Sequence, residues 1–219
     1  MTRIRLILLL SMSAVTAAAQ PPAVQKAEPA SAPASQPVLL AVTDNVHVIE
    51  PGRAYRCAQL TGPKFRKVIQ ENRIAVVLNL RGENPKADWY QAEVQACRDA
   101  GVELVNIALS ASKRPSRENL LRLYRLFRDE KRPILIHCRA GADRTGLASA
   151  LWRMIVLNEP AERAVGQLSM KYGHFGFAHP HLSGLVREFK AEETWITSQY
   201  DPRRDIEKGG SDSGDDDDD

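Results

Sequence analysis

At residues 133–145 the chain reads Pro133-Ile134-Leu135-Ile136-His137-Cys138-Arg139-Ala140-Gly141-Ala142-Asp143-Arg144-Thr145, and this stretch decides the fold. The apolar residues 133–136 are typical of a buried strand, and the run 145–157, which is apolar all round, is typical of a buried helix. A strand that continues through a short loop into such a helix indicates an α/β protein. Because ligands of these sheets bind beyond the carboxyl ends of the strands, we expect the loop after residue 137 to be the functional site.

The loop has the features of an anion-binding site with a nucleophile. Gly141 allows the backbone to curl, and the successive N–H groups of a curled loop point toward one anion. The next helix begins near Arg144, so the positive end of its dipole falls on the same point. The guanidinium of Arg144 can bind two phosphate oxygens, and Cys138 lies under the same positive potential, which favours a thiolate. The pattern therefore predicts in-line attack of sulfur on a bound phosphoryl group.

The segment 38–200, which we interpret as one domain, alternates strand and helix patterns along its length. Strands are predicted at residues 46–49, 54–57, 74–80, 102–109 and 133–136. Helices are predicted at residues 63–72, 87–100, 145–157, 160–170 and 182–196, and after Ser116, where Leu120, Leu123, Tyr124 and Phe127 share one face. The alternation predicts an α/β fold with a largely parallel central sheet flanked by helices.

Three segments outside this domain have their own composition. Residues 1–19 combine Arg3 and Arg5, a short apolar run and three alanines, which is the pattern of a cleaved secretory signal peptide. Residues 20–37 are rich in Ala and Pro and read as a disordered linker, and residues 201–219 form a disordered acidic tail. We therefore expect a periplasmic or secreted protein.

Charge and cysteine content narrow the choice of ligand. The chain has 30 Lys and Arg against 27 Asp and Glu, but two arginines lie in the signal segment and six aspartates in residues 211–219, so residues 20–210 carry +7. A basic body suits an anionic substrate, and a solvated surface or contact with a membrane surface would explain it as well. With three cysteines, at least one thiol stays unpaired within a monomer. A disulfide would have to join Cys57 and Cys97. Otherwise Cys57 is either a buried hydrophobic side chain or a resolving thiol for Cys138.

The stretch from His137 to Thr145 resembles the His-Cys-x5-Arg-Ser/Thr loop of the protein tyrosine and dual-specificity phosphatase superfamily. The segments 55–59, 79–83 and 172–176 are similar to its bacterial or atypical dual-specificity members. The resemblance implies that Cys138 forms a phosphocysteine, Arg144 binds the phosphoryl oxygens, Thr145 stabilises the sulfur and His137 orients the loop. It also implies that the phosphate lies against the remaining loop residues: Arg139, Ala140, Gly141 and Ala142.

The sequence departs from this superfamily at its general acid. Most members carry an aspartate about thirty residues before the cysteine, but residues 106–116 contain no Asp or Glu. Asp143 is the best substitute, and its alternative role is to brace the loop. Ala142 replaces a lysine that is frequent in phosphoinositide-acting relatives, which weakens the case for that substrate. His174, His179 and His181 offer three metal-ligand side chains, but the resembling family has no metal site at this spacing and Pro180 separates two of them, so we expect no metal and no cofactor.

The main hypothesis is therefore a monomeric enzyme that hydrolyses phosphate monoesters, on a phosphorylated protein or a small phosphate ester. Exported lipid-phosphate or inositol-phosphate hydrolysis by the same mechanism is the alternative. A rhodanese-like sulfurtransferase would need a loop shorter by one residue, and a non-catalytic phosphate-binding module would not need Cys138. We expect no nucleic-acid partner. Lys113 and Arg114 are either a solvated turn or a rim that contacts substrate.

Overall fold

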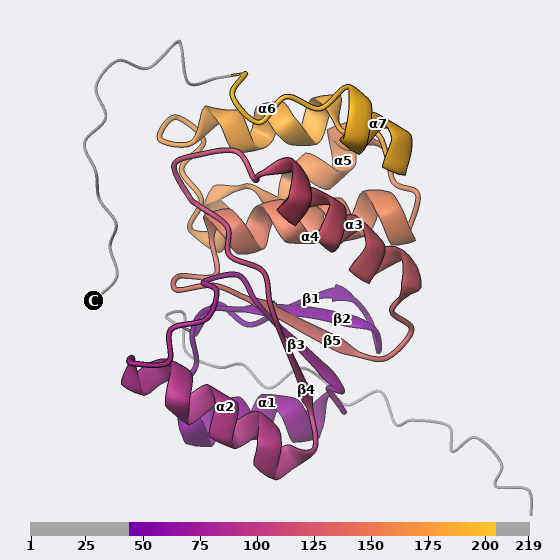
Figure 1. Cartoon of the computed structure of the whole chain (residues 1–219). Helices are drawn as coiled ribbons and strands as arrows, with labels where there is room; N and C mark the ends of the chain where they lie inside the picture. Colours follow the sequence, from indigo (N-terminus) through magenta and orange to yellow (C-terminus); the bar gives the residue numbers. More distant parts are fainter. Residues whose placement is uncertain (1–43, 205–219) are drawn as a thin grey trace, which may run out of the picture. The chain divides into compact units, whose positions relative to one another are not determined.

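The structure is a computed structural model that describes residues 44–204 (Figure 1). Its strands are β1 (His47–Glu50), β2 (Ala54–Cys57), β3 (Val76–Asn79), β4 (Glu103–Asn106) and β5 (Ile134–His137). Its helices are α1 (Gly62–Glu71), α2 (Asp88–Ala100), α3 (Arg117–Asp129), α4 (Asp143–Val156), α5 (Ala161–Ala164), α6 (Pro180–Glu188) and α7 (Glu193–Ser198). The predicted signal peptide and linker, and the tail from residue 205, lie outside the described residues.

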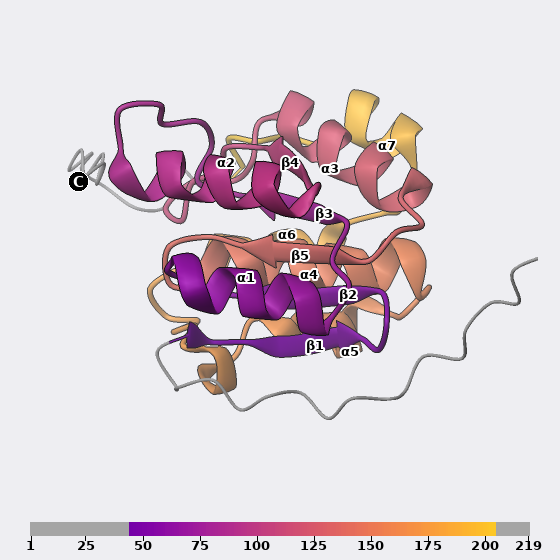
Figure 2. The same cartoon turned by 90° about the horizontal axis from the view of Figure 1, so that it is seen from below.

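The strands form one sheet in the order β1-β2-β5-β3-β4. Strands β2, β5, β3 and β4 are parallel, and only β1 runs antiparallel, to β2. Helices α1 and α2 cover one face of the sheet and the other helices cover the opposite face (Figure 1), while Figure 2 shows β5 in the middle. The predicted α/β fold with a largely parallel sheet is confirmed, and β5 carries the cysteine loop at its centre.

Each face of the sheet packs on its own hydrophobic cluster. Leu135 of β5 contributes to the cluster under α1 and α2, whereas Ile134 and Ile136 contribute to the larger cluster under α3, α4 and α6. Alternate side chains of a strand point to opposite faces, so a strand between two helical layers must be apolar throughout. The four residues of β5 are all buried, which gives the functional loop a rigid origin.

Local signals set several helix boundaries as predicted. Pro63 lies in the first turn of α1, and the Ser116 side chain caps α3 by accepting a hydrogen bond from Asn119 N at 3.1 Å. Gly101 ends α2 with a φ of +65°. Glycine adopts this left-handed conformation without the steric strain that a Cβ would cause. Within residues 44–204 we find no helix with the length and apolar character that crossing a membrane requires.

Two predicted helices are wrong in extent. The helix expected at 160–170 ends at Ala164 and continues only as short 3₁₀ turns, because α4 approaches so closely at Gly146 that a Cβ there would lie 2.9 Å from the Gln167 carbonyl. The helix expected at 182–196 is two helices, α6 and α7. Phe189 takes an extended conformation between them, and its ring meets that of Trp195 edge-on at 5.7 Å in the core.

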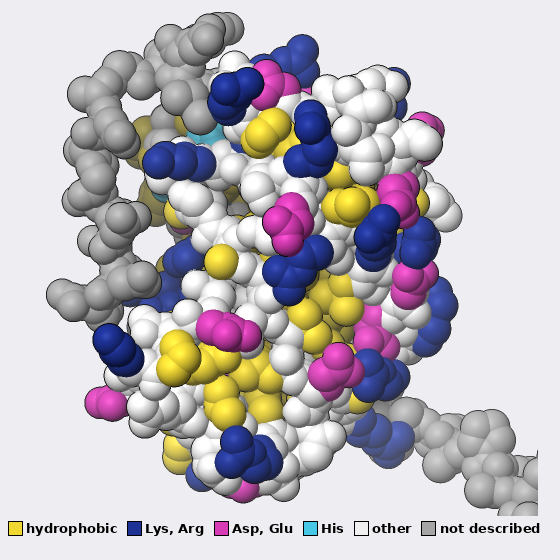
Figure 3. Space-filling view, viewed as in Figure 1, with side chains coloured by type: hydrophobic (Ala, Val, Ile, Leu, Met, Phe, Trp, Pro, Cys, Tyr) yellow, Lys and Arg dark blue, Asp and Glu magenta, His cyan; other side chains and the backbone are white. Residues whose placement is uncertain are grey.

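The surface is mixed in charge. In the space-filling view (Figure 3), basic and acidic side chains are interspersed over this face, and hydrophobic side chains show in its lower half, on the side of α2. Lys and Arg side chains also lie along the left edge of the view, where the carboxyl ends of the parallel strands lie. That edge contains the cysteine loop.

Candidate active site

The loop of residues 138–142 connects the central strand β5 to α4. The structure confirms the predicted context of a buried strand before the loop and a buried helix after it, with Asp143 as the first helical residue. The Cys138 side chain starts where β5 ends, and the residue is only 3 % exposed. The positive end of the α4 dipole therefore falls on the loop.

Carbonyl groups in and next to the loop accept hydrogen bonds, four of them from distant parts of the chain and one from α4. His137 O accepts from Leu80 N at 2.9 Å, Arg139 O from Gln59 N at 3.0 Å, Ala140 O from Asn45 Nδ2 at 3.0 Å, Gly141 O from Arg56 Nη2 at 2.7 Å and Ala142 O from Gly146 N at 2.7 Å. Within the described residues, we find no acceptor for the N–H groups of residues 138–142. Because one side of the curled backbone is occupied by donors, its N–H groups are left for an anion on the other side.

Gly141 is required where it stands. Its φ of +70° lies in the left-handed region, and a Cβ at this position would lie 2.7 Å from the backbone of Cys57 and Ala58. Both neighbours are backbone atoms of a buried strand end and cannot move aside. Any larger residue would push the loop away from β2 and open the anion site.

Arg144 and Thr145 follow the loop. The guanidinium of Arg144 can donate hydrogen bonds to a phosphoryl group, and the hydroxyl of Thr145 can donate one to a thiolate. Arg144 is partly exposed, and its Nη1 donates to the Leu109 carbonyl at 3.4 Å, which leaves other guanidinium donors for a ligand. The Thr145 hydroxyl is buried and has no hydrogen-bond partner in the described part of the chain. Buried hydroxyl groups are normally satisfied. A thiolate at Cys138 would give this one an acceptor.

A buried arginine beneath the loop is a feature that the sequence did not reveal. Arg56 is fully buried, its Nη1 donates to Gln167 O at 2.9 Å and Oε1 at 2.8 Å, and its guanidinium lies 4.0 Å from the Tyr172 ring centroid. Burial lowers the pKa of Arg56 to about 10, so it remains cationic at neutral pH. Within residues 44–204 it forms no ion pair with a carboxylate. A buried cation of this kind is costly, and a thiolate or phosphoryl group in the loop would supply the missing negative charge.

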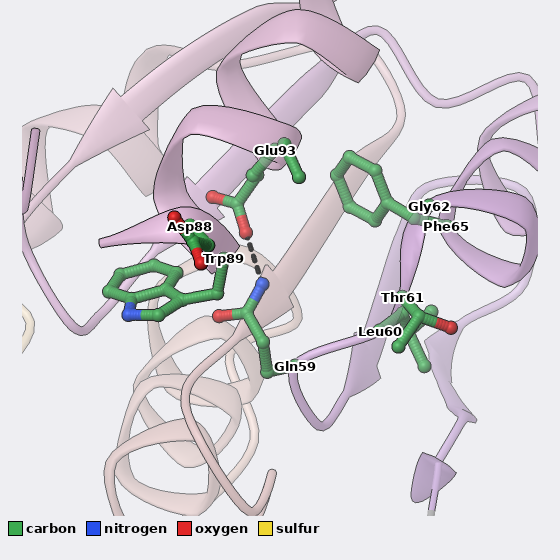
Figure 4. A pocket seen from close by; sticks show the side chains of 9 residues that line it. Gln59, Leu60, Thr61, Gly62, Phe65, Asp88, Trp89 and Glu93 are labelled. Carbon is green, nitrogen blue, oxygen red and sulfur yellow. Dashed lines mark hydrogen bonds between the residues drawn. The ribbon is translucent and has the colours of Figure 1, made fainter. Parts of the chain in front are cut away.

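His137 lies against a second unforeseen residue, Glu93 of α2. Its Nε2 lies 3.2 Å from Glu93 Oε2, without the alignment of a hydrogen bond, and both side chains are almost fully buried. Gln59 Nε2 donates to the same carboxylate oxygen at 2.6 Å, as the dashed line in Figure 4 shows. Glu93 thus holds the end of β5 from α2.

The pocket drawn in Figure 4 lies beside Glu93 and has a volume of about 260 Å³. It is lined by Gln59, Leu60, Thr61, Gly62, Phe65, Asp88, Trp89, Ala92 and Glu93. None of the loop residues 138–145 contributes to its lining. This pocket is therefore separate from the cysteine loop.

Asp143 is held by histidines from the segment before α6. Its Oδ1 lies 2.6 Å from Nδ1 of His174, which is 1 % exposed, and its Oδ2 lies 3.9 Å from Nε2 of His179. Asp143 is itself partly exposed at the loop. His174 thus fixes one carboxylate oxygen, and His179 lies near the other. Nothing in the sequence indicated that His174 pairs with Asp143.

Other residues named from the sequence have plainer roles. Arg114 is buried and pairs with Glu188, so it belongs to the structure of the domain, whereas Lys113 is exposed. Cys57, Cys97 and Cys138 are free thiols in the structure. Burial raises the pKa of Cys57 well above its usual range and that of Cys97 to about 12, so both stay neutral near pH 7. This favours the role of a buried side chain for Cys57.

The three histidines do not form a metal centre. His181 Nε2 lies 3.0 Å from the Ala111 carbonyl oxygen, which attaches α6 to the loop after β4. The rings of His174 and His179 are 6.2 Å apart. Among residues 44–204 no group of three or more His, Cys, Asp or Glu side chains has the arrangement to hold a metal ion.

Comparisons with known proteins identify the family and the fold. Residues 31–180 match a family model described as "DSP-PTPase phosphatase fused to NAD+ Kinase". No curated protein matches the chain significantly. Among solved structures, TpbA of P. aeruginosa in complex with pTyr is similar at 18 % identity and a TM-score of 0.56, over 73 % of this chain and 94 % of that chain.

Two further structures share the fold. The catalytic core of the PP-IP phosphatase SIW14 from S. cerevisiae is 18 % identical with a TM-score of 0.57, over 68 % of this chain and 87 % of that chain. PTPMT1 in complex with PI(5)P is 18 % identical with a TM-score of 0.55, over 70 % of this chain and 97 % of that chain. These neighbours share one fold, but they bind or act on different phosphate compounds.

Proposed function

Because the chain belongs to the family of DSP-PTPase phosphatases, we propose that it hydrolyses phosphate monoesters through a phosphocysteine intermediate, with phosphotyrosine or phosphoserine/threonine proteins as substrates. The observation that carries the mechanism is the loop of residues 138–142, whose carbonyls are held outward and whose N–H groups are left for an anion. Cys138 is the first residue of this loop, and Arg144 is the second residue of α4, which follows it.

In the first step, the loop N–H groups and Arg144 bind the phosphoryl oxygens. The Cys138 thiolate attacks phosphorus in line with the leaving oxygen, so the S–P bond forms as the P–O bond breaks. Arg56, beneath the loop, stabilises the negative charge of the bound phosphoryl group, and the Thr145 hydroxyl stabilises the negative charge of the Cys138 thiolate. The leaving oxygen takes a proton from Asp143 and departs as an alcohol or phenol.

In the second step, water attacks the phosphocysteine, and the S–P bond breaks to return the thiolate. The Asp143 carboxylate now takes the proton of the attacking water, and inorganic phosphate is released. His174 holds Oδ1 of Asp143, so we assign the transferred proton to Oδ2. We regard His174 as a positioning residue, because it acts through Asp143.

The experiment that tests this function is the release of inorganic phosphate by the purified chain from a phosphotyrosine peptide, a phosphoserine peptide, an inositol phosphate and an activated aryl phosphate. We expect turnover of the aryl ester and of at least one phosphopeptide, unaffected by a metal chelator. Turnover of the inositol phosphate alone would move the substrate to that class. Failure on every ester would support a non-catalytic phosphate-binding module.

We further propose that the enzyme acts in the periplasm or as a secreted protein, on the strength of the signal-like residues 1–19. We expect the natively expressed protein to begin near Gln20 and to be a monomer. N-terminal sequencing of the protein recovered from the exported fraction checks where the chain begins, and its mass in solution checks the monomer. Recovery of the intact chain from the cytoplasm would contradict it.

A further inference from the structure

The exposed large hydrophobic side chains of the described residues are concentrated in one short segment. Met170 is 76 % exposed, Phe175 49 % and Phe177 87 %. No other large hydrophobic side chain between residues 44 and 204 is exposed to this degree. We call residues 170–177 the apolar rim. Single exposed apolar residues are common, but the rings of Phe175 and Phe177 lie together, with centroids 6.0 Å apart, and Met170 is exposed in the same segment, so we interpret the group as an interaction surface.

The apolar rim is fastened to the catalytic loop. Asn45 Nδ2 donates to both Ala140 O in the loop and Tyr172 O in the rim, at 3.0 and 2.9 Å. A Cβ on Gly173 would lie 3.7 Å from Cβ of Ala142, and His174 holds Asp143. The rim therefore borders the mouth at which a phosphate ester must enter. A binding partner that covers the exposed side chains of the rim therefore also lies next to the phosphate ester in the site.

Positive charge accompanies the apolar side chains. Lys171 is exposed between Met170 and Tyr172, Arg139 is exposed in the catalytic loop, and Lys113 is exposed on the loop after β4. Lys and Arg side chains line this edge of the molecule in Figure 3. Protruding aromatic side chains mixed with Lys and Arg are the composition of a segment that binds the surface of an anionic bilayer.

We propose that the apolar rim docks the enzyme on an anionic membrane surface, and that the preferred substrate is a phospholipid whose headgroup ends in a phosphate monoester. This rests on the proposed phosphatase function, but it ranks a lipid above the phosphoproteins named there as the preferred substrate. A side chain as exposed as that of Phe177 protrudes from the surface. The boundary between headgroups and acyl chains deforms around such a side chain, whereas a phosphoprotein would need a matching pocket. Charge complementarity with the anionic surface also favours the lipid.

The test measures binding and turnover on vesicles of phosphatidylcholine with or without phosphatidic acid. We expect the full chain to co-sediment with the anionic vesicles, to release phosphate from phosphatidic acid, and to lose binding as salt is raised. The double variant Met170→Ser/Phe177→Ser should weaken vesicle binding by about tenfold for each apolar side chain removed. Its turnover of a soluble aryl phosphate should stay within about twofold of the wild type, since neither side chain belongs to the catalytic loop.

Charge variants give a matched control. Lys171→Glu in the rim should reduce binding to anionic vesicles, whereas Lys131→Glu, in the turn before β5 at the opposite end of the sheet, should not. Full turnover of soluble ester without vesicle binding, or equal losses in both charge variants, would overturn the membrane proposal and leave the phosphatase function standing. Faster turnover of a phosphopeptide, with that turnover lowered by the double variant, would assign the rim to a protein substrate. Absence of turnover on every ester would instead reject the proposed function.

Discussion

Replacing Asp143 by asparagine should slow the hydrolysis of phosphotyrosine or alkyl phosphates by about 10²–10⁴-fold, which is the usual contribution of general acid catalysis. Asparagine keeps the shape of the side chain and can still bond to His174, but it cannot give a proton to the leaving oxygen. An aryl phosphate whose leaving group is stable as an anion needs no such proton. We therefore expect a much smaller loss on the activated ester.

The measurement is kcat/KM for both esters in the wild type and in Asp143→Asn, with thermal unfolding as a control for structure. The basic limb of the pH–rate profile should flatten for the poor leaving group only. His174→Gln should give a smaller loss with the same dependence on the leaving group, because it loosens Asp143 without removing the proton. Equal losses on both esters, together with a lower melting temperature, would mean that Asp143 only braces the loop. The next candidates for the general acid would then be Glu83, which follows β3, and Asp88, the first residue of α2.

The parts of the site that the sequence predicted are those that lie close together along the chain. The buried strand, Cys138, the left-handed Gly141, Arg144 and the start of α4 all fall within eleven residues of Ile134, and the structure brings them together as expected. Turn glycines and capping residues act within a few positions of themselves, so their patterns can be read directly. The alternation of strands and helices likewise follows from local periodicity.

The supporting residues could not be predicted because their contacts depend on which strands become neighbours. Arg56 reaches Gly141 only because β2 pairs with β5, and Glu93 reaches His137 only because α2 packs on that face of the sheet. His174 is 31 positions from Asp143, and its bond requires the irregular chain that replaces the predicted helix at 160–170. In the sequence, a buried arginine or glutamate looks like any exposed one.

Cys138→Ser should reduce turnover of every ester by roughly 10⁴–10⁶-fold, the scale on which loss of a nucleophile acts. A serine hydroxyl lacks the thiolate's reactivity, but it fits the same space, and the loop N–H groups, Arg144 and Arg56 remain in place. The variant should therefore still bind phosphate or vanadate. Cys97→Ser is the matched control: it replaces a buried cysteine in α2, outside the loop, and should keep most of the activity.

The most direct test of the proposed mechanism is mass spectrometry of the wild-type enzyme quenched during turnover of an activated aryl phosphate. The mechanism predicts one phosphoryl group bound to Cys138, present during turnover, absent before substrate is added and absent from Cys138→Ser. A phosphoryl group on another residue would contradict it, as would steady turnover by the serine variant.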